Sequence, residues 1–399
     1  MNALANALSG LPTARPEEIG LSRAALQRLS GAVSREIEAG RAPGAAMLVA
    51  RHGKVAFSQT LGALRPDGPS MSEDAIFRIY SMTKPIVSVA AMMLVEEGRL
   101  SISDPLAKYI PAFAKTMVGV ETESGLELAP LKRPITIQDL LRHTSGLSYG
   151  FTGASKVQQM LLAAAPMTQD KTIAEFVEAL AALPLRYQPG EVWEYGHSTD
   201  VLGRVIEVIS GERLGDFLHD RLFAPLGMTD TAFYVPESKL HRLAQPRSFD
   251  FMKAGGIDLI ESRAPPRCEY GGGGLVSTLG DYARFVSALN GGGAFGGARI
   301  LGSRTIAFMT SDHLAPNVVK EHALLWPGHG FGLGFAVRTD AGLAPTAGAV
   351  GEFFWGGVAG TVFWVSPRDA LFAVLLVQAP ENREFFRQLF RNLVNAAIV

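Results

Sequence analysis

Ser81 and Lys84 have the residue types and the spacing for acyl-transfer chemistry. They follow a strand-like run, residues 77–80, and open an apolar, helix-like segment, residues 85–95. At a helix start, side chains three positions apart lie on one face within reach of each other. A lysine placed in this way can activate a serine without a histidine. The stretch therefore predicts a nucleophile at Ser81, the alternative being a helix-capping serine beside a solvated lysine.

Ser148 is a second candidate nucleophile, because residues 146–150 read Gly-Leu-Ser-Tyr-Gly and match the G-x-S-x-G pattern of α/β-hydrolases. A nucleophile elbow requires a buried strand before the serine and a helix after it. Here residues 137–142 are helix-like, with a capping box at Thr136, and residues 151–153 are loop-like. Ser148 therefore lies in a less suitable context than Ser81. A triad remains an alternative, with these downstream partners: His197, His219, His241, His313 and Asp200.

The sequence offers no pattern for a metal or a cofactor. It lacks the H-E-x-x-H spacing, and its single cysteine, Cys268, excludes an internal disulfide and is expected to be structural. The glycine runs at residues 271–274 and 291–293 lack the Lys-Ser ending of a phosphate-binding loop, so we interpret them as flexible turns. We expect no cofactor and no metal site.

Composition limits the partners. The chain has 399 residues, of which 47% are apolar and 19% charged, with a net charge of -1 and no basic stripe. A nucleic-acid partner is therefore not expected. The longest apolar run, residues 86–95, is about half the roughly 18 residues of a membrane span. Residues 1–16 lack the basic start and apolar core of a signal peptide. We expect a cytoplasmic protein with a small-molecule substrate, and its oligomeric state is open.

The predicted secondary structure of the segments that position these residues changes along the chain. Residues 45–60 predict a hairpin that turns at His52-Gly53. The middle of the chain reads as helical and loop-rich, whereas the last third contains three strand-like stretches and a final amphipathic helix. The stretches are residues 331–337, 353–365 and 371–378, and the expected helices are residues 17–39, 175–182, 200–209 and 381–396.

Strands at both ends with helices between them predict an α/β fold. We expect an antiparallel sheet built from both termini and flanked by helices, with a mainly helical inserted domain. Residues 1–80 and 270–399 would form the α/β domain, and residues 81–269 the helical one. The active site would lie in the cleft between them.

Three motifs together resemble a known superfamily. They are Ser81-x-x-Lys84, then Tyr195-Gly196-His197 after a Pro-Gly pair, and Trp355-Gly356-Gly357 in a C-terminal strand pair. Their order and spacing resemble the serine β-lactamase-like superfamily, in its class C β-lactamase and D-alanyl-D-alanine peptidase branch. Within that branch the chain is most similar to the family VIII carboxylesterases. The resemblance runs from about residue 20 to the C-terminus.

The resemblance implies roles for individual residues. Ser81 would be the nucleophile, with Lys84 and Tyr195 as the base system, either as a neutral lysine or as a phenolate. Because the two would titrate as a coupled pair, the sequence leaves that choice open. The oxyanion would be bound by the backbone N–H groups of Ser81 and Val358. The implied substrate-binding residues are Tyr149, His197, Trp355, Gly356 and Gly357.

Departures from the superfamily pattern indicate the substrate. Class C β-lactamases carry Tyr-x-Asn and Lys-Thr-Gly boxes, and neither tripeptide occurs here. Trp355 replaces the cation that would hold a substrate carboxylate, and family VIII esterases share this Trp-Gly-Gly box. The resemblance therefore implies a carboxylesterase for short-chain neutral esters, acting through an acyl-enzyme on Ser81. Bulky Tyr149 and Trp355 suggest a closed pocket, with acyl chains limited to about C6 to C8.

Three alternatives use the same residues. One is a β-lactamase or D-alanyl-D-alanine peptidase, and another is an acyltransferase that passes the acyl group to an alcohol or amine. The third is a penicillin-recognition protein that is acylated and does not turn over.

Overall fold

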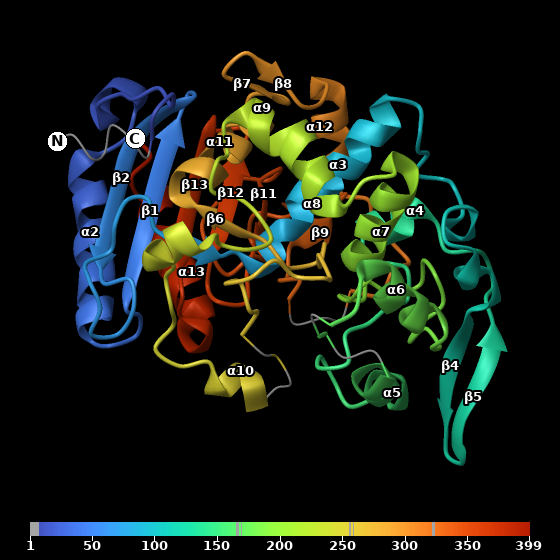
Figure 1. The fold of residues 1–399 in the computed structure, drawn as a ribbon. Helices are drawn as coiled ribbons and strands as arrows, with labels where there is room; N and C mark the ends of the chain where they lie inside the picture. The colour runs from blue at the N-terminus through green and yellow to red at the C-terminus, as the bar shows by residue number, and fades with distance from the viewer. Residues whose placement is uncertain (1–7, 165–166, 169, 255–256, 258, 321–323) are drawn as a thin grey trace.

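A seven-stranded antiparallel sheet forms the centre of the protein (Figure 1). The structure is a computed structural model, and it describes residues 8–164, 167–168, 170–254, 257, 259–320 and 324–399. The strand order is β2-β1-β13-β12-β11-β10-β9. The bounds are β1 Gly44–Arg51, β2 Lys54–Gly62, β9 His329–Phe331, β10 Ala336–Arg338, β11 Phe353–Gly356, β12 Val362–Ser366 and β13 Leu371–Val377.

The two ends of the chain meet in this sheet, as predicted. β1 and β2 form the expected hairpin, and its turn residues His52 and Gly53 both have left-handed φ values, 52° and 72°. β1 then pairs with β13 from Ala45 opposite Val377 to Arg51 opposite Leu371. Figure 1 shows this junction as blue strands beside red ones. The α/β fold class with a sheet from both termini is confirmed.

Two of the predicted strands are each a pair of strands. The stretch 331–337 contains the end of β9, a turn and the start of β10, with Gly334 at φ 97° in that turn. The stretch 353–365 contains β11 and β12, joined by a turn at residues 357–361. Both strands of each pair are apolar, so hydrophobicity alone merged them.

Helices cover both faces of the sheet because alternate strand residues point to opposite sides. On one face, α2 (Arg23–Glu38) and α13 (Arg383–Asn395) pack against residues such as Val49 and Trp364. On the other face, α11 (Leu279–Asn290) and α3 (Thr83–Glu96) pack against residues such as Leu48 and Phe363. α2 and α13 also contact each other, so the helices from the two termini form one layer.

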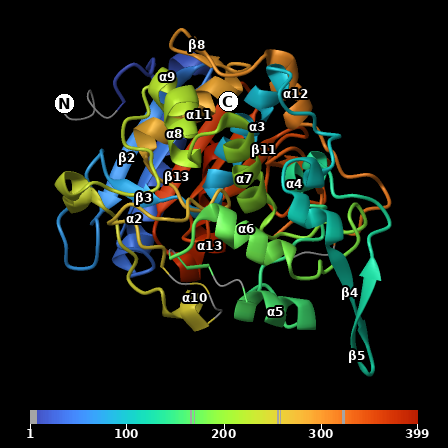
Figure 2. The same cartoon turned by 45° about the vertical axis from the view of Figure 1, so that its right-hand side comes forward.

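The middle of the chain is mainly helical, as expected, but it also holds a hairpin that was not predicted. The hairpin consists of β4 (Met117–Thr122) and β5 (Gly125–Pro130) and projects from the body (Figures 1 and 2). The helices are α4 Ile137–Leu141, α5 Lys156–Ala164, α6 Ile173–Ala181, α7 Ser198–Ser210, α8 Leu214–Leu218, the π-helix η5 His219–Phe223, α9 Ala224–Leu226, α10 Asp250–Ala254 and, later in the chain, α12 Ser303–Met309.

Several short elements connect these parts. β3 (Ile76–Arg78) pairs with β6 (Val276–Thr278), and β7 (Ala294–Phe295) pairs with β8 (Ala298–Arg299). The 3-10 helices are η1 Pro16–Ile19, η2 Tyr80–Met82, η3 Leu106–Lys108, η4 Pro111–Lys115, η6 Glu237–Arg242 and η7 Pro380–Asn382.

The predicted domain boundaries at residues 81 and 269 remain a prediction. No helix in the described ranges is long and apolar enough to cross a membrane. The expected cytoplasmic location likewise remains a prediction.

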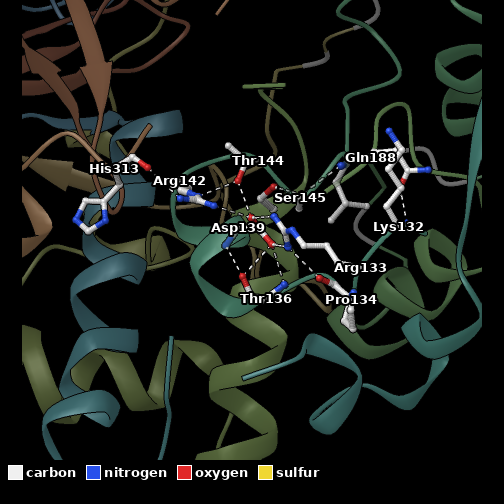
Figure 3. A network of polar contacts seen from close by, with 12 residues as sticks. Lys132, Arg133, Pro134, Thr136, Asp139, Arg142, Thr144, Ser145, Gln188 and His313 are labelled. Atoms are coloured by element: carbon white, nitrogen blue, oxygen red, sulfur yellow. Dashed lines mark hydrogen bonds and ion pairs between the residues drawn. The ribbon is translucent and has the colours of Figure 1, made fainter. Parts of the chain in front are cut away.

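A buried carboxylate at Asp139 fixes the segment that leads to Tyr149 (Figure 3). Arg133 donates two hydrogen bonds to it, at 2.6 and 2.9 Å, and Arg142 donates a third at 3.1 Å. Thr136, the N-cap of α4, and Thr144 donate hydroxyl hydrogen bonds at 2.8 and 2.7 Å. Asp139 thus joins the start of α4 to the chain that follows it.

This network predicts a pH-dependent contribution to stability. Burial alone would raise the pKa of Asp139, but Arg133 together with Thr136 and Thr144 lowers it to about 2. Asp139→Asn keeps the shape and removes the charge, and it should lower the free energy of unfolding by about 3 kcal/mol at pH 7 in urea titrations. Because the folded pKa lies below the ordinary 3.8, this difference should persist down to about pH 4 and shrink as the pH falls towards 2. A difference independent of pH across that window would contradict the account.

Candidate active site

Ser81 lies on a sharp turn between a strand and a helix. β3 ends at Arg78, Tyr80 adopts a left-handed conformation with φ 44°, and Ser81 follows in η2, directly before α3. A left-handed backbone is unfavourable for a bulky residue, so surrounding contacts must hold it. Ile79 donates its N–H to the Leu275 carbonyl at 3.1 Å. The strand-then-helix context was predicted, whereas the left-handed residue before the serine was not.

Lys84 is buried and donates to three acceptors. Its Nζ lies 3.2 Å from Ser81 Oγ, 3.1 Å from Tyr149 Oη and 2.5 Å from the Gly272 carbonyl oxygen. An ammonium group has three N–H donors, so these acceptors match its full capacity. The structure therefore brings the predicted serine and lysine into direct contact at the start of α3.

The acceptor at Gly272 is held in place by a buried acid. Asp200 Oδ1 accepts the Gly272 N–H at 2.7 Å, and Asp200 Oδ2 bonds His197 Nδ1 at 2.8 Å. A Cβ at residue 272 would lie 2.9 Å from Asp200 Oδ1 and 3.0 Å from Tyr149 Oη, which only glycine avoids. Residues 271–273 form a turn, as predicted, and within it the Gly272 carbonyl accepts a hydrogen bond from Lys84, a contact that the sequence did not indicate; the flexibility of this turn remains a prediction. Sequence reasoning also gave Asp200 no part in the Ser81 site.

Two tyrosines flank Lys84. Tyr195, from the predicted motif, accepts a hydrogen bond from Trp355 Nε1 at 3.1 Å, and its ring centre lies 4.5 Å from Lys84 Nζ. Tyr149, expected only to line the cleft, bonds Lys84 directly. Burial, with nearby Asp200 and Tyr195, raises the pKa of Tyr149 well above its usual range. Tyr149 therefore stays a neutral phenol at ordinary pH.

The β11–β12 turn lies against the segment that precedes the nucleophile. A Cβ on Gly357 would lie 2.3 Å from the Ile79 carbonyl oxygen, so glycine permits this close approach. Gly356 and Val358 line the same cavity as Ser81. Gly357 packs against Ile79, and its expected role in substrate binding remains a prediction. The assignment of the oxyanion to the N–H groups of Ser81 and Val358 remains a prediction.

The cavity above Ser81 has a volume of about 860 Å³. Tyr149, His197 and Trp355 line it, in the positions expected for substrate-binding residues. Part of its wall comes from two stretches to which the sequence gave no role, residues 150–152, 161–162 and 167–168 in the first and residues 252–253, 257 and 259–261 in the second. The cavity is therefore larger than the closed pocket expected from Tyr149 and Trp355. The apolar part of these walls consists of Phe151, Leu161, Leu162, Met167, Met252, Ile257, Leu259 and Ile260.

Ser148 has a different environment from Ser81. It is buried, with Oγ bonded to Glu194 Oε1 at 2.5 Å and to Gln158 Nε2 at 3.1 Å. It follows α4 in a loop, which is not the strand-to-helix elbow of an α/β-hydrolase. Of its possible triad partners, His197 bonds Asp200 beside the Ser81 site. The hydroxyl of Ser148 therefore serves to pair the buried side chains of Glu194 and Gln158.

Cys268 and possible metal ligands were the other candidates for chemistry in the sequence. Burial raises the pKa of the free Cys268 thiol, which makes the thiol unreactive at neutral pH. Among the residues that the structure describes, no group of three or more His, Cys, Asp or Glu side chains could hold a metal ion.

Comparison with known proteins agrees with this geometry. The family model described as Beta-lactamase matches residues 29–398. The chain belongs to the beta-lactamase family. It is 30% identical to esterase EstB of Burkholderia gladioli over 386 residues, which cover 90% of this chain and 92% of EstB. It is 31% identical to the lovastatin esterase of Penicillium rubens over 334 residues, which cover 78% of this chain and 81% of that protein.

A solved structure extends the likeness to the fold. EstCE1, described as a hydrolase with promiscuous acyltransferase activity, superposes with a TM-score of 0.78 at 27% identity, over 93% of this chain and 98% of its own. The predicted membership of the family VIII esterases, within the serine β-lactamase-like superfamily, is thus confirmed. This beta-lactamase family protein is a serine hydrolase.

The two serines can be separated by substitution. Ser81→Ala should lower kcat for p-nitrophenyl butyrate by at least roughly 10³. Ser148→Ala should keep most of the activity while lowering Tm, because it leaves buried Glu194 without a hydroxyl partner. An inactive but folded Ser148→Ala beside an active Ser81→Ala would refute the assignment of Ser81.

The Lys84–Tyr195 pair can be tested with a double mutant. Lys84→Ala and Tyr195→Phe should each lower kcat by at least roughly 10², and the double variant should lose little more than either, because groups that act as one unit give non-additive losses. Steady-state kinetics on folded protein, verified by circular dichroism, measures this. Losses that multiply would indicate two independent roles.

Proposed function

We propose that this protein is a serine carboxylesterase that hydrolyses neutral esters, short-chain esters included, through an acyl-enzyme on Ser81. The observation that carries the proposal is the 3.2 Å contact between Lys84 Nζ and Ser81 Oγ on the wall of an 860 Å³ cavity. The esterases among its relatives support the same reaction class.

Acylation begins at the Ser81 hydroxyl. The Lys84–Tyr195 pair takes its proton as Oγ attacks the ester carbonyl carbon, and the carbonyl oxygen becomes an anion. The backbone N–H groups of Ser81 and Val358 stabilise that oxyanion. The tetrahedral intermediate collapses and the C–O bond to the alcohol breaks. The pair returns the proton to the departing alkoxide, so the neutral alcohol leaves and the pair can again accept a proton. Ser81 is then an ester of the substrate acid.

Deacylation reverses these roles. A water molecule gives a proton to the Lys84–Tyr195 pair and attacks the acyl carbon. The bond to Ser81 Oγ breaks, Oγ recovers the proton, and the carboxylic acid is released. The hydrogen bond from Trp355 Nε1 to Tyr195 Oη fixes the position of that oxygen.

Trp355, in the Trp355-Gly356-Gly357 motif, favours neutral substrates. Its indole lines the cavity where related enzymes place a lysine, and its single N–H is already donated to Tyr195. It therefore offers apolar area and no charge to a substrate carboxylate. The volume of the cavity does not support the expected limit at C6 to C8, since pockets of roughly 300–1,000 Å³ hold drug-sized ligands.

Transfer of the acyl group to an alcohol is the second candidate activity. A cavity of 860 Å³ leaves space for an acceptor alcohol beside an acyl group on Ser81. EstCE1 is described as having promiscuous acyltransferase activity. Formation of butyl butyrate from p-nitrophenyl butyrate and 1-butanol would reveal it.

Substrate choice tests the proposal. The kcat/KM for p-nitrophenyl butyrate should exceed that for nitrocefin by at least roughly 10², or about 2.7 kcal/mol, because the Trp355 indole offers the cephalosporin carboxylate no charge at the position where related enzymes place a lysine. The value for p-nitrophenyl octanoate should stay within about tenfold of the butyrate value, as the cavity volume requires. Ser81→Ala is the control and should be inactive on all three. Equal efficiency on nitrocefin would favour a β-lactamase, and a burst without turnover would favour a penicillin-recognition protein.

A further inference from the structure

Arg387 connects the C-terminal helix α13 to the β11–β12 turn. Its Nη2 donates to the Gly357 carbonyl at 2.5 Å and approaches the Thr361 carbonyl at 3.4 Å, while Nη1 is paired with Glu384 at 2.7 Å. A Cβ on Gly356 would lie only 2.7 Å from Arg387 Nη2, so glycine lets the guanidinium lie close beside the strand. The sequence gave this arginine no role.

The Gly357 carbonyl belongs to the same peptide unit as the Val358 N–H. A trans peptide is planar, with its C=O and N–H pointing in opposite directions, and the described residues contain no cis peptide. The carbonyl end is held from two sides, because the Gly360 N–H also donates to it at 2.9 Å. Fixing the carbonyl therefore fixes the direction of the Val358 N–H, on the side away from Arg387.

A cation at the carbonyl end also strengthens the donor at the other end. Hydrogen bonds in a chain polarise one another, and a charged donor is stronger than a neutral one. Glu384 pairs with the opposite side of the guanidinium and so fixes its orientation. Lysine could supply the charge but lacks the planar fork that bonds the Gly357 carbonyl through one nitrogen and Glu384 through the other.

We propose that Arg387 is a positioning residue of the oxyanion hole, which orients and polarises the Val358 N–H through the Gly357 carbonyl. This inference rests on the proposed acyl-enzyme function, in which that N–H binds the oxyanion. Arg387 also lines the cavity, and its proposed action on the oxyanion runs through the Gly357–Val358 peptide.

The test compares an ester with its thionoester, whose sulfur accepts hydrogen bonds weakly and so depends less on the oxyanion hole. Arg387→Met should lower kcat for p-nitrophenyl butyrate by roughly 10- to 100-fold, less than loss of a whole oxyanion donor, with KM within about threefold. For the thionoester the loss should be no more than about threefold. Arg387→Lys should recover part of the ester activity. Gln388→Met, at the exposed neighbouring position of α13, is the matched control and should change neither rate.

The outcomes separate this inference from the function on which it rests. Equal losses on ester and thionoester in folded Arg387→Met, or no loss on the ester, would overturn the role of Arg387 and leave the esterase intact. If Arg387→Met does not fold, the same comparison on Arg387→Lys decides. Activity in Ser81→Ala, or no labelling of Ser81 by a p-nitrophenyl phosphonate, would instead overturn the proposed function.

Discussion

The site depends on placing the Lys84 amino group away from water among three hydrogen-bond acceptors. Burying a polar group without partners is costly, so Lys84 requires partners in fixed positions. It finds them in Ser81, Tyr149 and Gly272, which lie far apart in the sequence. Each partner has its own support: a left-handed Tyr80 presents Ser81, and Asp200 holds Gly272. Much of the surrounding structure therefore serves to keep these acceptors around one nitrogen.

The meeting of the two termini supplies the opposite wall of the site. Pairing of β1 with β13 fixes the C-terminal strands, and the β11–β12 turn then lies against Ile79. The same turn carries Val358, and Arg387 ties it to α13. The last helix of the chain therefore stabilises the sheet and also holds a peptide unit beside the nucleophile. Such rigidity suits an oxyanion site, where donors must be in place before charge develops.

The wall of the cavity away from Ser81 and Lys84 is held by different interactions from those that hold these two residues. Hydrogen bonds and close glycine contacts hold Ser81, Lys84 and their neighbours, whereas apolar side chains at residues 151, 161–162, 167, 252, 257 and 259–260 line much of the cavity. Apolar contacts are non-directional and tolerate many ligand shapes.

The sequence by itself determined the chemistry and the outline of the fold. Ser81, Lys84 and the two-ended sheet follow from local spacing and periodicity, which short stretches encode. Tertiary structure decided what depends on contacts between distant segments: the bond from Tyr149 to Lys84, the place of Gly272, the volume of the cavity and the reach of Arg387. The sequence alone indicated only a turn at residues 271–274. That Asp200 lies beside Gly272 depends on the packing of segments that are distant in the sequence, which local sequence patterns do not encode.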